Sequence, residues 1–270
     1  MTKSLKIGLL HLSPKLGALD ANRALIESGT RAAAGLGAEW IISGELVVCG
    51  YRFAPVLGTD WISEQPDLWM RRLAELNAEL GVVSFVSHPE RDSAGGRLFN
   101  SLFVIGRDGR LVGRQRKLRP TPVSEDWANP GELSQPIVVD ELGVGLLVCA
   151  DAYSAEPAAR LRTAGAEMLV SSAAWWPGRW GPNGEWEARS RESGLPLIVC
   201  NRTGREGAAH MVGAESVIVD RGAKLLTLRA AKSTVFVVEC DLDDGHIASC
   251  VLAATTVSYT HLTLPTILRV

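Results

Sequence analysis

The sequence predicts one α/β domain, built as a layered sandwich of mixed β-sheets with helices on the outside. Short apolar runs that are typical of buried strands alternate with segments of helical periodicity, which favours strand–helix–strand units. Two turn signals, Arg107-Asp108-Gly109 and Asp220-Arg221-Gly222, each lie between strand-like runs and predict hairpins. The chain has 270 residues, of which 46% are hydrophobic, so we expect a sizeable core in a single domain over residues 1–256.

Strands and helices alternate through the first part of the chain. Apolar runs predict strands at residues 6–12, 39–43 and 81–88. Helical spacing predicts helices at residues 20–34 and 65–80, the first of them capped by Asp20.

A hairpin and a long loop follow. The hairpin strands are expected at residues 98–105 and 111–117, so that Lys117 ends the second strand. The next segment, residues 118–134, is irregular and rich in proline, and it contains Glu125 and Glu132. Loops of this length without regular structure are often functional.

The second half of the chain begins with another strand–helix–strand unit. Two apolar runs, GVGLLV and EMLVSSAA, flank a helical segment that ends at Ala164-Gly165-Ala166. Cys149 follows the first of these strands, at the end where α/β proteins place ligands. The remaining predicted elements are a Trp-rich loop, a helix, a strand, a hairpin and a final strand, at residues 175–183, 185–192, 195–201, 212–228 and 234–242. Residues 257–270 depart from this pattern, and we expect a non-native or disordered tail.

Charge and cysteine usage narrow the class of function. The net charge is −2 and no basic block is present, which argues against a nucleic-acid or anionic-membrane partner. No apolar run approaches the roughly 20 residues of a membrane span. The five cysteines include no CxxC pair, which disfavours a disulfide framework or a zinc site and favours a reduced cytoplasm. The histidines lack metal-ligand spacing, so we expect no metal and no cofactor.

Three residues with chemical potential follow strand-like runs in separate parts of the chain: Glu45, Lys117 and Cys149. A thiol attacks as the thiolate, so it requires a base or a positive neighbour. A buried carboxylate can take the proton and later return it to a leaving amine. An ammonium group and the backbone N–H of Ala150 could stabilise an oxyanion. Each residue alone has a simpler explanation, since a cysteine in an apolar strand is more often a core filler.

Three motifs in order resemble the nitrilase, or carbon–nitrogen hydrolase, superfamily. They are ISGELVVCGY around Glu45, FNSLFVIGRDGRLVGRQRKLRP around Lys117, and LLVCADAYSAEPAARLRTAGAEMLVSSAAW around Cys149. Two later segments, CNRTG and AESVIVDRGAKLL, are also similar to the family, so the resemblance covers nearly the whole chain. It implies a four-layer αββα sandwich and a homodimer or higher homo-oligomer.

The resemblance also implies a role for individual residues. Glu45 would be the general base and acid, Lys117 the stabiliser of the oxyanion, and Cys149 the nucleophile. A further glutamate in this family positions the substrate and the lysine. Glu125 is the best candidate for it, and Glu132 is the second. Two other acidic residues, Asp151 and Glu156, are expected to cap and anchor the following helix rather than do chemistry.

Departures from the family pattern bear on the substrate. Gly44 stands where the family usually has proline, which leaves the backbone rigidity around Glu45 open. The nitrile-hydrolysing branch typically carries Cys-Trp-Glu, whereas this chain has Cys149-Ala150-Asp151, and this favours a small amide substrate. The aromatic residues Tyr51, Trp175 and Trp176 are expected with Ala150 at the substrate, while Trp180 and Trp186 are assigned to packing.

The sequence therefore predicts hydrolysis of a small carboxamide or N-carbamoyl compound through a cysteine thioester. Two alternatives remain open at this point. The same cysteine could hydrolyse a nitrile or transfer the acyl group to an amine. The chain could also be a non-catalytic relative that binds a small molecule.

Overall fold

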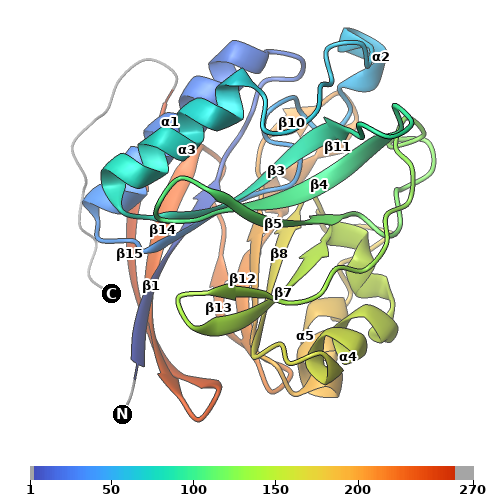
Figure 1. Ribbon diagram of the computed structural model, residues 1–270. Coiled ribbons are helices and arrows are strands. Elements are labelled where there is room, and N and C mark those ends of the chain that lie inside the picture. Colours follow the sequence, from blue (N-terminus) through green and yellow to red (C-terminus); the bar gives the residue numbers. More distant parts are fainter. Residues whose placement is uncertain (1–2, 259–270) are drawn as a thin grey trace.

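The computed structural model describes residues 3–258 and consists of two β-sheets that pack face to face between two layers of helices (Figure 1). The largest hydrophobic cluster joins both sheets, with Ile7 and Phe85 from one and Leu146 and Val199 from the other. Burial of these apolar faces is the main force that holds the layers together. The predicted αββα sandwich is confirmed.

The first sheet has seven strands in the order β15-β14-β1-β2-β3-β4-β5. Only β1, β2 and β3 run parallel to one another, and the other neighbours are antiparallel. The strands are β1 (Lys3–His11), β2 (Trp40–Ser43), β3 (Val83–Arg91), β4 (Leu98–Ile105), β5 (Leu111–Arg116), β14 (Thr234–Asp243) and β15 (His246–Thr256).

The second sheet has six strands in the order β13-β12-β9-β8-β7-β6, with β7, β8 and β9 parallel. A two-stranded ribbon of β10 and β11 lies apart from it. The strands are β6 (Ile137–Val139), β7 (Leu142–Val148), β8 (Met168–Ala173), β9 (Leu197–Asn201), β10 (Arg205–Glu206), β11 (Ala209–His210), β12 (Ser216–Asp220) and β13 (Ala223–Leu228).

Helices α1 (Leu19–Gly35) and α3 (Leu68–Leu80) cover the outer face of the seven-stranded sheet (Figure 1). Their buried residues form a second hydrophobic cluster with that sheet. Helices α4 (Ala155–Thr163) and α5 (Glu185–Ser193) lie against the six-stranded sheet. The short elements are α2 (Ala54–Leu57) and the 3-10 turns η1 (Cys149–Tyr153) and η2 (Met211–Gly213).

Several predicted boundaries are corrected. Helix α1 begins at Leu19 and its N-cap is Ala18, so Asp20 lies in the first turn and does not cap it. Helix α3 begins only at Leu68, because the side chain of Asp67 accepts a hydrogen bond from Met70 N at 2.7 Å and caps the helix there.

The final predicted strand is not the last one. Strand β15 follows β14 and pairs with it along its length, yet most of its side chains are exposed or half-buried. Although residues 250–254 of this edge strand are apolar, only Ile247 and Thr255 of β15 are buried. The predicted tail, residues 257–270, lies outside the described residues beyond Ser258, whereas Val257 is buried and packs against the α1–α3 cluster.

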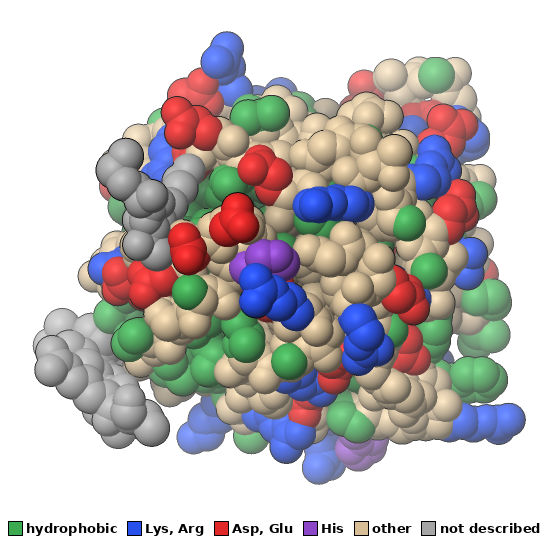
Figure 2. Space-filling model, turned by 90° about the horizontal axis from the view of Figure 1, so that it is seen from below, with side chains coloured by type: hydrophobic (Ala, Val, Ile, Leu, Met, Phe, Trp, Pro, Cys, Tyr) green, Lys and Arg blue, Asp and Glu red, His purple; other side chains and the backbone are tan. Residues whose placement is uncertain are grey.

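The surface seen from below carries acidic and basic side chains interspersed with hydrophobic and neutral ones (Figure 2). Within residues 3–258, no helix combines the length and apolarity needed to cross a bilayer. No group of three or more His, Cys, Asp or Glu side chains in this part of the chain is arranged to hold a metal ion.

Candidate active site

Glu45 lies two residues after the end of β2 and is fully buried between the two sheets. Its backbone N donates to Ala173 O at 3.0 Å, and its Oε2 accepts a hydrogen bond from Ala174 N at 3.0 Å. Its Oε1 accepts from Lys117 Nζ at 2.6 Å and from Asn100 Nδ2 at 2.8 Å. The carboxylate is therefore held from both sheets in one orientation.

Gly44 packs tightly against the end of β9. A Cβ atom at this position would lie 3.0 Å from Arg202 N and 3.1 Å from the carbonyl carbon of Asn201. A Cβ atom this close to backbone atoms would force the end of β9 to move by a few tenths of an ångström. The glycine thus allows the end of β2 to approach β9 and brings Glu45 close to β8.

Lys117 follows β5, and its ammonium group lies between two carboxylates. Its Nζ is 2.6 Å from Glu45 Oε1 and 2.5 Å from Glu125 Oε2, and all three side chains are buried. Burial opposes the charged form, but the fields of Glu125 and Glu45 outweigh it and raise the pKa of Lys117 well above its ordinary value. Lys117 is a permanent cation in this site.

Glu125 lies in the loop after Lys117, as the sequence predicted for the second glutamate. It accepts hydrogen bonds from Thr121 N at 2.9 Å, Asn100 Nδ2 at 2.6 Å and Tyr51 Oη at 3.2 Å. Burial would raise the pKa of Glu125, but Lys117 and these donors outweigh it and hold the pKa below its ordinary value. Glu125 therefore stays ionised.

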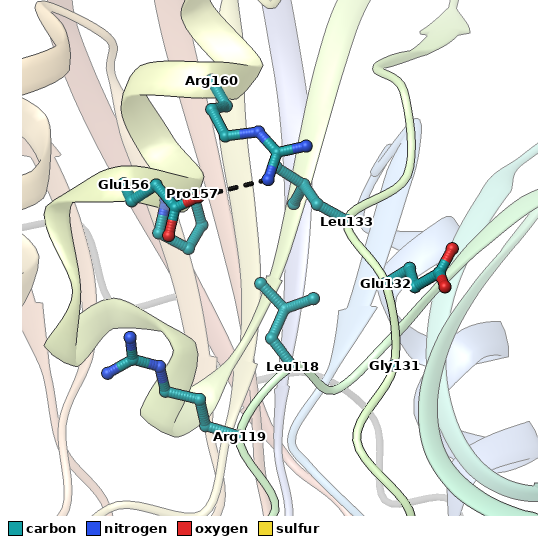
Figure 3. A pocket seen from close by; sticks show the side chains of 8 residues that line it. All are labelled: Leu118, Arg119, Gly131, Glu132, Leu133, Glu156, Pro157 and Arg160. Atoms are coloured by element: carbon teal, nitrogen blue, oxygen red, sulfur yellow. Dashed lines mark hydrogen bonds and ion pairs between the residues drawn. The ribbon is translucent and has the colours of Figure 1, made fainter.

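The second candidate, Glu132, is exposed and lies away from this cluster. It lines a separate hollow of about 380 Å³ between the loop and helix α4 (Figure 3). The side chains around that hollow include Leu118, Arg119, Glu132, Leu133, Glu156 and Arg160.

Cys149 follows β7 and begins the 3-10 turn η1 with a backbone φ of 48°, in the left-handed region. A non-glycine residue in this region costs of order 1–3 kcal/mol and is typical of functional turns. Cys149 is 4% exposed as a residue, and its thiol interacts with the neighbouring Glu45 carboxylate. Burial and the negative charge of Glu45 raise the pKa of the Cys149 thiol well above its ordinary value, although Lys117 opposes the shift. The thiol is therefore protonated and lies next to a proton acceptor.

The carboxylate of Glu45 binds a proton more readily than the carboxylate of Glu125 does. Burial raises the pKa of Glu45, the nearby charge of Glu125 adds to the rise, and Lys117 opposes it. Two carboxylates whose pKa values are shifted in opposite directions are typical of acid–base sites.

Asp151 links the cysteine turn to the segment after Lys117. Its Oδ2 accepts from Val148 N at 3.0 Å, and its Oδ1 accepts from Leu118 N at 2.9 Å and Arg119 N at 3.1 Å. Burial raises its pKa to about 7. The predicted helix cap is therefore wrong for Asp151, since α4 begins only at Ala155 and the carboxyl group binds other backbone.

Sequence reasoning missed a role for Asn100 as well. Its side-chain amide donates to both Glu45 and Glu125 from the middle of β4. The available signal was the amide of Asn100, beside Ser101, in the largely apolar strand LFNSLFVI, because a buried amide requires polar partners.

The predicted substrate-contacting aromatics separate into two groups. The ring of Tyr51 lies 5.8 Å from Lys117 Nζ and makes an edge contact at 6.3 Å with Trp176, which is half-buried. Trp175 instead packs between Tyr153 and Trp186, with ring centroids 4.7 and 5.4 Å away.

Ala150, Trp180 and Trp186 are the other residues near the site for which the sequence made a prediction. Ala150 follows Cys149 in the turn and is 7% exposed. Trp186 is buried, as expected for packing, whereas Trp180 is 73% exposed, so its assignment to packing is wrong. The guanidinium of Arg179 lies over the exposed ring of Trp180 at 5.0 Å, and the Trp180 carbonyl accepts a hydrogen bond from Trp175 Nε1 at 2.9 Å.

Comparison with known proteins places these features in context. The family model described as carbon–nitrogen hydrolase matches residues 6–246. A glutamine-dependent NAD(+) synthetase of Rhodobacter capsulatus is 28% identical over 91% of this chain and 45% of its own length. A nitrilase of Pyrococcus abyssi is 26% identical over 88% of this chain and 90% of its own. The structure of an amidase from Nesterenkonia sp. superposes with a TM-score of 0.77 at 24% identity, covering 89% of this chain and 90% of that one.

The chain spans less than half the length of the first curated relatives that it matches, with 45% and 40% of two NAD(+) synthetases covered. The nitrilase and the amidase, by contrast, are matched over nine tenths of their length. In this chain the residues that match the family model, 6–246, include the cluster of Glu45, Lys117, Glu125 and Cys149.

Proposed function

The chain belongs to the carbon–nitrogen hydrolase family, and on this basis we propose that it is a thiol-dependent amidase. Its substrate would be a small carboxamide or N-carbamoyl compound, whose non-peptide C–N bond is cleaved through a cysteine thioester. The convergence of a thiol, a proton-accepting carboxylate and an ammonium group at Cys149, Glu45 and Lys117 supports this proposal. In such a site the carboxylate can act as the base that activates the thiol, and the ammonium group can stabilise the oxyanion formed on acyl transfer.

Acylation begins when Glu45 takes the thiol proton and Cys149 Sγ attacks the carbonyl carbon. Glu45 is suited to this step because burial raises the pKa of its carboxyl group. Negative charge then develops on the carbonyl oxygen, where Lys117 Nζ and Ala150 N–H would stabilise it. Glu45 returns the proton to the leaving nitrogen, and ammonia or an amine departs.

Deacylation uses the same groups with water as the nucleophile. Glu45 removes a proton from the water molecule that attacks the thioester, and it returns this proton to Cys149 as the thiol leaves. Lys117 stays charged throughout, because Glu125 remains ionised beside it. Glu125 is thus a positioning residue that also balances the charge of Lys117 while Glu45 is protonated.

The turn sequence favours amides over nitriles, since Ala150 and Asp151 replace the Trp-Glu pair that is typical of the nitrile-hydrolysing branch. One relative is named nitrilase, so nitrile hydrolysis is retained as an alternative function. Acyl transfer from the same thioester to an amine is the other alternative. A non-catalytic binding role is disfavoured because Cys149, Glu45 and Lys117 are all present and in contact.

The surroundings of Cys149 favour a small acyl group. Cys149 and Ala150 are 4% and 7% exposed, and Tyr51 and Trp176 provide aromatic surface on the Lys117 side. The relatives named glutamine-dependent make L-glutamine a second substrate to test beside simple aliphatic amides.

Ammonia release from matched amides and nitriles tests the proposal. The panel contains aliphatic carboxamides, N-carbamoyl amines, L-glutamine, and the nitrile that corresponds to each amide. We expect release from at least one carboxamide or carbamoyl compound and a lower kcat/KM for the matched nitrile. Release from nitriles alone would reverse the preference, and added hydroxylamine would reveal acyl transfer as a hydroxamate.

We also propose an oligomeric state and a cellular location for the protein. The first is a homodimer or higher homo-oligomer, which light scattering of the purified protein would test. The second is a cytoplasmic location, which fractionation of the source cells would test.

A further inference from the structure

Two thiols lie side by side at the edge of the seven-stranded sheet, on strands that supply none of the residues of the candidate active site. Cys240 on β14 and Cys250 on β15 are opposite each other in the antiparallel ladder. Their Sγ atoms are 3.3 Å apart.

This geometry suits a covalent bond between the sulfurs. Opposite residues in an antiparallel pair have Cα atoms about 4.5 to 5.5 Å apart. Disulfides accept Cα separations of about 4.4 to 6.8 Å, so the backbone distance is already suitable. The sulfurs would need to approach by roughly 1.2 Å to reach the S–S bond length of about 2.05 Å. Small side-chain rotations on an edge hairpin can supply this movement.

The two thiols differ in exposure and in reactivity. Cys240 is fully buried, whereas Cys250 is half-buried on the edge strand. The hydrogen bond from Cys240 lowers the pKa of Cys250, and the same contact together with burial raises the pKa of Cys240. Cys250 is therefore the thiol that can ionise and meet a reagent from solvent.

The remaining thiols outside the active site lack this arrangement. Cys49 and Cys200 are both fully buried, and burial raises the pKa of each. Their sulfurs lie near the backbone carbonyls of Leu46 and Asn201, at 3.7 and 3.8 Å. They provide matched buried cysteines for comparison.

We propose that Cys240 and Cys250 form a reversible disulfide, a modification site that fixes the last strand of the sheet to its neighbour. The oxidant is a low-molecular-weight disulfide. The Cys250 thiolate attacks one of its sulfurs, forms a mixed disulfide and releases one thiolate. Cys240 then attacks Cys250 Sγ, gives up its proton, and releases the second thiol. The protein loses two hydrogen atoms, and the small disulfide is reduced to two thiols.

The expected physical effect is on the edge strand. The bond would close the hairpin turn between β14 and β15, so the unfolded chain would lose the freedom of that loop. Closure of a loop of this size is worth an increase in Tm of about 5 °C for a domain of this length.

Oxidised glutathione and peptide mass mapping test the proposal on the intact folded protein. We expect a cross-linked product of the peptides that contain Cys240 and Cys250, the increase in Tm, and reversal of both by dithiothreitol. In Cys240→Ala the mixed disulfide should persist on Cys250, whereas in Cys250→Ala Cys240 should remain unmodified. Cys200→Ala should leave the cross-link yield unchanged.

Two results of these experiments would contradict the proposed disulfide. A cross-link that appears only after denaturation would overturn the proposal, as would a stable mixed disulfide on Cys250 of the unmutated protein. Circular dichroism verifies that each variant is folded. If Cys240→Ala fails to fold, the cross-link and its reversal in the unmutated protein still decide the question. None of these measurements depends on catalysis by Cys149.

Discussion

The carboxylates of Glu45 and Glu125 hold the same ammonium group, with Lys117 Nζ 2.6 Å from the first and 2.5 Å from the second. Their environments nonetheless shift their pKa values in opposite directions, upward for Glu45 and downward for Glu125. Burial and the charge of Glu125 raise the pKa of Glu45, whereas at Glu125 the charge of Lys117 and the hydrogen bonds from Lys117, Asn100 and Thr121 N outweigh burial. One carboxylate is thereby free to exchange a proton while the other keeps the lysine charged.

Replacement of Glu45 tests the proton transfer itself. Glu45→Gln keeps the size of the side chain but removes the proton acceptor. General acid–base catalysis contributes about 10²- to 10⁴-fold, so kcat/KM for the best amide should fall by that factor. Steady-state ammonia release measures it, and an unchanged rate would remove Glu45 from the mechanism.

Replacement of Glu125 tests the division of roles between the two glutamates. Glu125→Gln leaves Lys117 with Glu45 as its only carboxylate partner, which would hold Glu45 ionised and make it a weaker proton acceptor. We expect kcat to fall about 10²-fold with a smaller change in KM, since misplaced catalytic groups cost about this much.

Glu132→Gln is the matched control, because Glu132 lies in the same loop but is exposed. Its kinetic constants should stay within about twofold of the original protein. Equal losses in both variants would show that the loop, rather than the Glu125 carboxylate, is responsible.

The close approach at Gly44 predicts a local sensitivity to size. Gly44→Ala would place a methyl group 3.0 Å from Arg202 N, and overpacking of this kind costs about 1–3 kcal/mol. Because Glu45 is the next residue, kcat should fall as well. In Gly35→Ala the added methyl group meets nothing within 4 Å at the end of α1, and the free energy of unfolding should rise by about 0.5–1 kcal/mol. Urea denaturation compares the two, and equal stabilities would contradict the packing argument.

Burial of His88 makes the free energy of unfolding depend on pH in the acidic range. Burial lowers the pKa of His88 from 6.5 to about 4. Between these values the unfolded chain binds a proton that the folded protein does not, so the free energy of unfolding falls as the pH drops from 6.5 to 4. The contribution of one such group reaches about 3 kcal/mol.

His88→Phe should remove this contribution while it keeps an aromatic ring against Trp69, which stacks on His88 with centroids 5.7 Å apart. The measurement is the free energy of unfolding of both proteins at several pH values. The difference between them should change in favour of the variant as the pH falls from 6.5 to 4. A constant difference would mean that His88 does not titrate on unfolding.

The buried strands and the catalytic candidates could be predicted because they depend on local pattern. Continuous apolar runs identified β7 and β8. Cys149 could be singled out because it places a thiol immediately after the apolar strand β7. Edge strand β15 was missed because only Ile247 and Thr255 among its 11 residues are buried, so its sequence shows little of the pattern of a buried strand.

The partners of Asp151 and Asn100 could not be predicted, because they lie far away in the sequence. Asp151 binds backbone that follows Lys117, and Asn100 bridges two glutamates from separate loops. Trp175 and Trp176 are adjacent in the segment after β8, yet Trp175 packs against Trp186 and Trp176 against Tyr51.

The measurement that tests the account most directly is the mass of Cys149 during turnover. The protein is mixed with the best amide of the panel, quenched in acid within the first turnovers, and analysed by intact and peptide mass spectrometry. We predict an added acyl group on the peptide that contains Cys149, and neither adduct nor ammonia release in a folded Cys149→Ala variant. Undiminished ammonia release from Cys149→Ala would contradict the thioester mechanism.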